Sequence, residues 1–224
     1  MPLDLARVQA VCFDVDGTLS DTDDEWVSRF STRLQRLGFL FRNRDPRRFV
    51  RRLVMFSESP MNFIYYWLDR LSLDDNFARM YERMILRRGK MARPFWLMNY
   101  ADELLTLLAT RFPLSIVSAR DELTTMRFVD QFALQKYFHF YATSQTCEHT
   151  KPYPQPVLWA AEQMLVPAQN CLMIGDTTVD ILAGKAAGAQ TVGVLCGFGT
   201  ESELRRAGAD LIVKDLKELF DLMK

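Results

Sequence analysis

The 224-residue sequence contains only two histidines, His139 and His149, which argues against a histidine-built metal site and against a Ser-His catalytic triad. Its four cysteines show no paired spacing, and Cys12 and Cys171 lie in strand-like runs, so we expect reduced, mostly buried thiols in a cytoplasmic protein. No apolar run approaches the roughly 18 residues of a membrane span, and the first residues lack the layout of a secretory signal. A metal site in this chain is therefore expected to use oxygen ligands, which hard cations prefer.

The net charge is zero, but the two signs are unevenly distributed along the chain. Residues 22–93 contain 16 Lys and Arg against 9 Asp and Glu, whereas the remainder contains 12 against 19. The hydrophobic content of 49% is ordinary for a globular protein, and the length suits one large domain or two small ones. The charge asymmetry predicts two regions with different tasks.

Short apolar runs alternate with helical stretches over most of the chain. Strands buried on both faces are predicted at 8–13, 114–117, 171–174, 191–195 and 211–213, and a further strand-like run covers 138–144. Helices are predicted at 102–109, 122–132, 155–164 and 179–187, with Gly188 ending one helix and Asp215 capping a last one. This alternation predicts an α/β fold, a Rossmann-like parallel sheet with helices on both faces.

Residues 22–93 break the alternation, because their apolar residues recur at helical spacing only. We predict an all-helical cap domain inserted after the first strand, with residues 1–21 and 94–224 forming the α/β core. Within the insert, Arg47, Arg48, Arg51 and Arg52 share one helix face. A nucleic-acid-binding protein that uses this basic insert is therefore an alternative, although the sequence pI of about 6.7 argues against it.

Polar residues follow several of the predicted strands at the point where each strand ends. They are Asp14, Asp16, Ser118, Lys151, Asp176 and Asp180. Because the carboxyl ends of parallel strands meet at one edge of a sheet, we expect these side chains to converge. Several acids around one point require a divalent cation such as Mg²⁺, while a lysine and a hydroxyl suit the oxygens of a phosphate.

These motifs, taken in order, resemble the haloacid dehalogenase superfamily. They are "DVDGT" (14–18), Ser118, "KP" (151–152) and "GDTTVD" (175–180). The resemblance is to the phosphatase branch with a helical cap, which includes phosphoglycolate phosphatases and β-phosphoglucomutases. It implies an enzyme that hydrolyses small phosphomonoesters with Mg²⁺. A phosphomutase of the β-phosphoglucomutase kind, which shares every core residue named here, remains an alternative.

The resemblance also implies a role for each motif residue. Asp14 is implied as the nucleophile that forms an aspartyl-phosphate, and Asp16 as the general acid and base. Mg²⁺ is implied to bind the Asp14 carboxylate, the Asp16 backbone carbonyl and Asp176. The residues implied for phosphate binding are Ser118, Ala119 and Lys151.

Three further residues have supporting roles or open alternatives. We expect Gly17 to permit a sharp turn and Thr18 to hold Asp16 by a hydrogen bond. Asp180 has three alternatives: to bind the metal through water, to orient Lys151, or to favour the N-terminus of the following helix.

Arginines are the candidates for contacts with the rest of the substrate. Arg120 either touches substrate or pairs with Asp121 or Glu122, its neighbours in the sequence. Arg29, Arg33 and Arg36 share a helix face in the insert and suit an anionic group, which favours phosphoglycolate, then pyrophosphate, over neutral sugar phosphates. The expected partner is thus a small phosphorylated metabolite, with no nucleic acid or membrane, and the expected state is a monomer or a weak homodimer.

Overall fold

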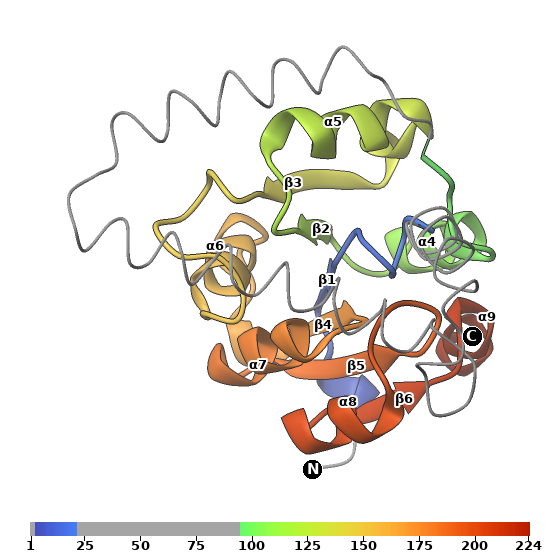
Figure 1. Ribbon diagram of the computed structural model, residues 1–224, viewed down its shortest axis with the longest axis vertical. Helices are drawn as coiled ribbons and strands as arrows, with labels where there is room; N and C mark the ends of the chain where they lie inside the picture. The colour runs from blue at the N-terminus through green and yellow to red at the C-terminus, as the bar shows by residue number, and fades with distance from the viewer. Residues whose placement is uncertain (1–2, 22–94) are drawn as a thin grey trace, which may run out of the picture. The chain divides into compact units, whose positions relative to one another are not determined.

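The chain divides into two compact units in the computed structural model, Met1–Thr22 with Phe95–Lys224 and Asp23–Pro94. The structure describes residues 3–21 and 95–224, which are drawn as ribbon in Figure 1. The helical cap predicted for 22–93 lies outside the described residues, as do Arg29, Arg33 and Arg36. The arginines behind the nucleic-acid-binding alternative lie there too.

Within the described part of the chain, six parallel strands form one sheet in the order β3-β2-β1-β4-β5-β6. The strands are β1 (Ala10–Phe13), β2 (Leu114–Val117), β3 (Phe138–Ala142), β4 (Cys171–Gly175), β5 (Gln190–Val194) and β6 (Leu211–Val213). The chain moves outward from β1 to β3, then returns to the other side of β1 and continues to β6. The order therefore reverses between β1 and β4, where open parallel sheets bind their ligands.

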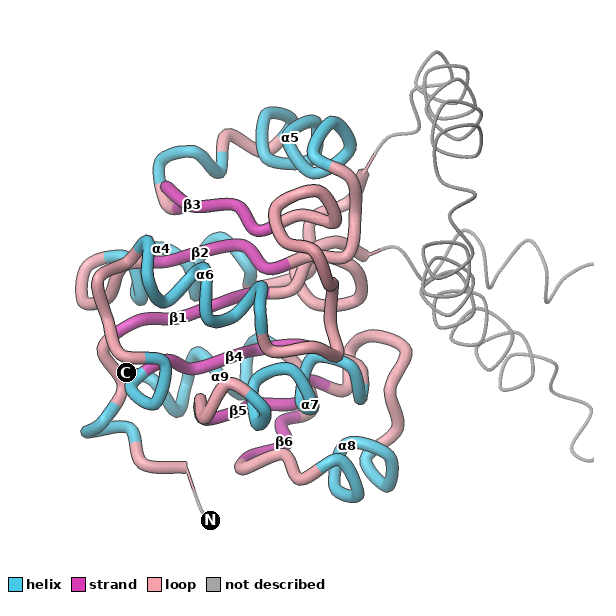
Figure 2. The backbone as a smooth tube through the Cα atoms, turned by 90° about the vertical axis from the view of Figure 1, so that its left-hand side faces the viewer, coloured by secondary structure: helices cyan, strands magenta, loops and turns pink. Residues whose placement is uncertain are grey.

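Helices cover both faces of this sheet (Figures 1 and 2). They are α4 (Ala101–Ala109), α5 (Glu122–Gln131), α6 (Gln155–Gln163), α7 (Thr178–Ala186), α8 (Glu201–Ala207) and α9 (Leu216–Met223), and short 3₁₀ helices lie at Leu5–Arg7, Leu134–Lys136 and Ala168–Asn170. Helices α4, α5 and α9 pack on one face, and α6 and α7 pack on the other. The predicted α/β class, with a parallel sheet between helices, is confirmed.

The first strand shows why the sheet is buried on both sides. Successive side chains of a strand point to opposite faces. Val11 and Phe13 join the core beneath α4, α5 and α9, whereas Ala10 and Cys12 join the smaller core beneath α6 and α7. All four are fully buried, so the sequence of the strand is continuously apolar and does not alternate between apolar and polar residues.

Helix boundaries follow local capping chemistry. The Asp215 carboxylate accepts a hydrogen bond from the Glu218 amide, as an N-cap should, and Gly188, which follows the C-cap residue Ala187 of α7, has φ = 81°. Helix α8 was missing from the sequence prediction, although Thr200 and Glu203 form a capping box at its start. Among the described residues, no helix has the length and apolarity that a membrane crossing requires.

Candidate active site

The loop that follows β1 carries two acids and is a tight turn. The Val15 carbonyl accepts hydrogen bonds from the amides of Thr18, Leu19 and Ser20. Gly17 has φ = 75°, a conformation that side chains disfavour, which agrees with the expected sharp turn. The Asp14 amide donates to the Ile174 carbonyl (2.9 Å), so β4 holds the start of this loop in place.

Asp14 faces a buried lysine that two carboxylates share. The Lys151 ammonium lies 2.6 Å from Asp14 Oδ1 and 2.6 Å from Asp180 Oδ1. The Lys151 side chain is 3% exposed, and the two carboxylates are 8% and 1% exposed. Lys151 comes from the loop between β3 and α6, so a segment 137 residues from Asp14 in the chain supplies its counter-charge.

The electrostatics of this group depend on burial. Burial raises the pKa of the Asp14 carboxyl to about 8, against the opposing effect of Lys151 and with a further contribution from Asp180. Burial by itself would lower the pKa of Lys151, but Asp14 and Asp180 raise it overall, so the ammonium stays charged. Full ionisation of Asp14 at neutral pH therefore requires more positive charge than Lys151 supplies.

Asp176 lies at the end of β4 and is held through both of its oxygens. Thr18 Oγ1 donates to Oδ1 over 3.5 Å, and the Phe198 amide donates to Oδ2 over 2.7 Å. The bond from Thr18 goes to Asp176, and not to Asp16 as the sequence had suggested. A Cβ on Gly197 would lie 2.1 Å from Asp176 Oδ2, so the loop can approach this closely because residue 197 is glycine.

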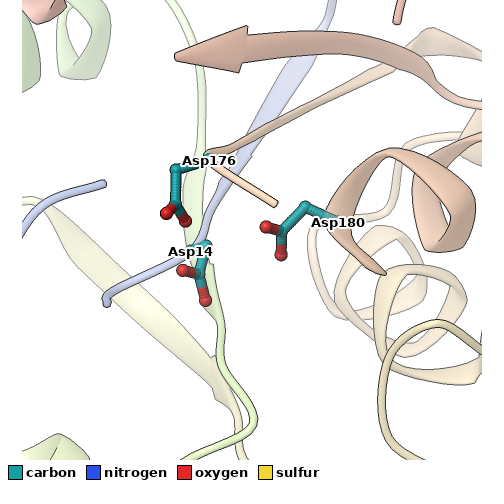
Figure 3. Close-up of side chains that lie close together, drawn as sticks. All are labelled: Asp14, Asp176 and Asp180. Carbon is teal, nitrogen blue, oxygen red and sulfur yellow. The ribbon is translucent and has the colours of Figure 1, made fainter. Parts of the chain in front are cut away.

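Three buried acids form a cluster that fits a divalent cation. One carboxylate oxygen from each of Asp14, Asp176 and Asp180 lies within 4.8 Å of the others (Figure 3). The group holds three carboxyl groups and the single ammonium of Lys151, so a divalent cation would balance its charge when all three are ionised, and oxygen ligands suit Mg²⁺. The donor set and its charge thus fit the predicted cation.

The contacts of Asp180 agree with two of the three roles raised for it from the sequence: it orients Lys151, and it caps the helix that follows. Its Oδ1 binds Lys151, which orients the ammonium toward Asp14. Its Oδ2 accepts hydrogen bonds from the Thr177 amide and hydroxyl, completing the capping box of α7. Asp180 therefore links the start of α7 to the lysine, and it reaches the acid cluster as well.

The residues after β2 lie next to this group because β2 neighbours β1. Ser118 is buried, and its amide donates to the Ala142 carbonyl (2.8 Å). Ala119 is exposed. The Arg120 amide donates to Ser118 Oγ (3.2 Å), so these residues form one turn at the end of β2.

Arg120 has a partner that the sequence did not indicate. Its guanidinium forms a two-pronged ion pair with Asp16, with Nε donating to Oδ2 and Nη2 to Oδ1. Local pairing with Asp121 or Glu122, one of the two alternatives raised for Arg120, is not what the structure shows: the guanidinium pairs with Asp16, and the Asp121 carboxylate caps α5 through the Thr124 amide and hydroxyl. The partner of Arg120 lies 104 residues away in the chain.

The sequence interpretation missed the loop after β5, which contributes backbone to the site. Phe198 donates its amide to Asp176, and Gly197 and Gly199 let the chain pass close to that residue. The signal was present as "CGFGT" (196–200), in which two glycines lie shortly after a buried strand. Such a pair marks a close approach of backbone to a functional group.

Comparison with known proteins assigns the family. A family model of haloacid dehalogenase-like hydrolases matches residues 11–194, and the chain belongs to this family, as its motifs predicted. The chain is 25% identical over 240 residues to a phosphoglycolate phosphatase from Neisseria meningitidis, with 97% of this chain and 94% of the relative covered. It is 24% identical over 216 residues to pyrophosphatase PpaX from Oceanobacillus iheyensis, with 96% and 97% covered.

The fold has counterparts among solved structures. The structure of a haloacid dehalogenase-like family hydrolase from Streptococcus pneumoniae superposes with a TM-score of 0.68 at 21% identity, covering 98% of this chain and 100% of that one. The sequence relatives span almost the whole chain and are named a phosphatase and a pyrophosphatase. The family and these sequence relatives agree with the predicted phosphoric monoester hydrolase.

Proposed function

We propose that this protein hydrolyses small phosphomonoesters through an aspartyl-phosphate on Asp14. The observation that carries the proposal is the position of Asp14, which lies at the reversal point of the sheet, 2.6 Å from a buried lysine and within reach of Asp176. A buried carboxylate beside a fixed cation suits attack on a phosphoryl group, because charge neutralisation is the main task in phosphoryl transfer.

The reaction has two steps. Asp14 attacks phosphorus, the bond to the ester oxygen breaks, and Asp16 gives its proton to the departing alkoxide. Asp16 then takes a proton from water, which attacks the phosphorus of the aspartyl-phosphate, releasing inorganic phosphate and restoring Asp14. Lys151 and Ser118 bind the oxygens of the transferring group throughout.

We also propose that the site works with Mg²⁺, held by the Asp14 carboxylate, the Asp16 backbone carbonyl and Asp176. When bound, the cation supplies positive charge to the phosphoryl oxygens and to the nucleophile. Asp180 supports the site by holding Lys151 and is placed close enough to act through water.

For the substrate we propose a small ester with an anionic tail, with phosphoglycolate first and pyrophosphate second. The support is the charge of the insert and the names of the relatives. Arg29, Arg33 and Arg36, on the helical cap that we propose for 22–93, are the candidate contacts. We expect the protein to act in the cytoplasm, as a monomer or a weak homodimer.

The test is a panel of phosphorylated metabolites assayed for inorganic phosphate, with and without Mg²⁺. Asp14→Asn serves as the control for contaminating phosphatases. We expect a higher kcat/KM for phosphoglycolate than for a neutral sugar phosphate, and a smaller ratio in Arg29→Ala, Arg33→Ala or Arg36→Ala. If the neutral ester is preferred and no arginine variant changes the ratio, the substrate proposal is wrong.

The same assay separates hydrolysis from mutase activity. A phosphomutase would need a sugar bisphosphate activator and would return an isomerised sugar phosphate. Steady release of inorganic phosphate without any bisphosphate supports the hydrolase. Formation of an isomeric sugar phosphate without release of inorganic phosphate would show that the protein is a mutase and not a hydrolase.

A further inference from the structure

Arg120 and Asp16 form a linkage that joins the turn after β2 to the loop after β1. Both carboxylate oxygens of Asp16 accept from the guanidinium, and the two side chains are 14% and 24% exposed. A bidentate arginine fork fixes the plane of a carboxylate as well as its position, which a single hydrogen bond cannot do.

The guanidinium of Arg120 also packs on an aromatic ring. Its guanidinium lies over the Phe95 ring, 4.9 Å from the centroid. Phe95 in turn exchanges two backbone hydrogen bonds with the Gln131 side chain (3.2 and 2.8 Å) and packs edge-to-face on Phe128. Helix α5 therefore supports the ring on which the guanidinium rests.

The backbone of Arg120 is equally constrained. Its amide donates to Ser118 Oγ (3.2 Å), and its carbonyl accepts from the Ser144 amide (2.8 Å). A residue whose amide contacts the proposed phosphate-binding serine thus extends its side chain to the proposed acid-base residue. Any shift of this turn would move both groups together.

We propose that Arg120 is a positioning residue for Asp16, which it holds in the orientation needed for proton transfer to the ester oxygen and from water. The ion pair uses one lone pair on each carboxylate oxygen, and a carboxylate offers about four acceptor positions in total. The remaining positions stay available for the proton, which Asp16 has to accept against the positive charge of Arg120. The inference rests on the hydrolase proposed above and adds a specific residue to its acid-base step.

The opposing explanation is that Arg120 attracts the substrate's negative charge. The two explanations differ in the kinetic constant they affect. Loss of a substrate contact raises KM, whereas loss of orientation lowers kcat with little change in KM. They also differ in leaving-group dependence, because 4-nitrophenolate departs with little help from an acid and an alkoxide does not.

The experiment compares Arg120→Ala, Arg120→Gln and Arg120→Lys on an alkyl phosphate and on 4-nitrophenyl phosphate. We expect Arg120→Ala to lower kcat on the alkyl phosphate by about 10- to 100-fold with KM nearly unchanged. The single-turnover release of 4-nitrophenolate should fall much less. Arg120→Lys should restore little, since an ammonium keeps the charge but cannot form the two-pronged bond. Thermal melting checks that each variant folds.

A double-mutant comparison closes the test. If Arg120 acts through Asp16, Arg120→Gln should cause no further loss in single turnover when added to Asp16→Asn. A multiplicative loss in that background, a rise in KM alone, or rescue by Arg120→Lys would overturn the proposal. Failure of the hydrolase proposal is recognised separately, because wild-type protein would then release no phosphate, or Asp14→Asn would remain active.

Discussion

The two sides of the reversal point contribute opposite charges to the site. The side beyond β4 supplies the carboxylates of Asp176 and Asp180. The side beyond β2 supplies Lys151, from the loop after β3, and Arg120. The two acids of the β1 loop lie at the boundary between these regions.

This difference explains how two acids one residue apart are accommodated. Asp14 pairs with Lys151 in a buried group, and Asp16 pairs with Arg120 in a partly exposed one. Two nearby carboxylates raise each other's pKa, and Asp16 does add to the raised pKa of Asp14, after burial and Asp180, while the counter-charges oppose this effect. Separate counter-charges allow one to serve as the proposed nucleophile and the other as the proposed acid and base.

The largest loss of activity is expected from a change of Asp14, in the loop between the two regions. Asp14→Asn keeps the size of the side chain but removes the attacking oxyanion, so kcat should fall by about 10⁴-fold or more. Phosphate release by the purified variant measures this, with melting temperature as the folding control. Substantial turnover at full Mg²⁺ would remove the basis for covalent catalysis by Asp14.

The cationic side is tested by Lys151→Met. The change leaves two buried carboxylates without their counter-charge, and breaking such a pair costs about 3–5 kcal/mol of stability. Loss of a group that stabilises phosphoryl charge should also lower kcat by about 10²- to 10³-fold. Lys217→Met is the matched control, because Lys217 pairs with Asp221 on the surface and its loss should leave the melting temperature unchanged. A variant as stable as wild type would show that the buried pair contributes nothing.

The anionic side is tested by Gly197→Ala. The added Cβ would lie 2.1 Å from Asp176 Oδ2 and 2.5 Å from the Gly17 carbonyl oxygen, so the carboxylate has to move. Displacing the Asp176 carboxylate, a proposed metal ligand, should raise the Mg²⁺ concentration needed for half-maximal activity by about 10- to 100-fold. Gly208→Ala, at a glycine with open space around it, should lower stability without changing the Mg²⁺ requirement. Equal Mg²⁺ requirements in both variants would contradict the assignment of Asp176.

The smallest effect expected is a pH-dependent stabilisation by Mg²⁺. The pKa of Asp14 in the folded protein is raised to about 8, so without a cation its favourable contribution is present at low pH and is lost as the pH rises toward that value. Mg²⁺ competes with the proton for this site. The rise in melting temperature on adding Mg²⁺ should therefore be larger at about pH 8 than at about pH 5. A rise that is independent of pH would exclude Asp14 as the titrating ligand.

Much of this protein was predictable from its sequence because the core strands are continuous apolar runs. Such runs indicate strands buried on both faces, and their alternation with helices indicates a parallel sheet. Parallel strands bring their carboxyl ends to one edge, so the convergence of Asp14, Lys151 and Asp176 followed from their positions after strands. Local signals likewise identified Asp215 as a helix cap.

Only the tertiary structure decided which partner each polar side chain has. Arg120 precedes two acids in the sequence, yet the cap of α5 occupies Asp121, and β1 lies beside β2, which brings Asp16 within reach. Asp176 is held by the amide of Phe198. Nearly every residue has a backbone amide, so the type of residue 198 does not indicate this bond. The physical reason is that strand position depends on local apolar pattern, whereas an ion pair or hydrogen bond depends on distances across strands that only the folded sheet establishes.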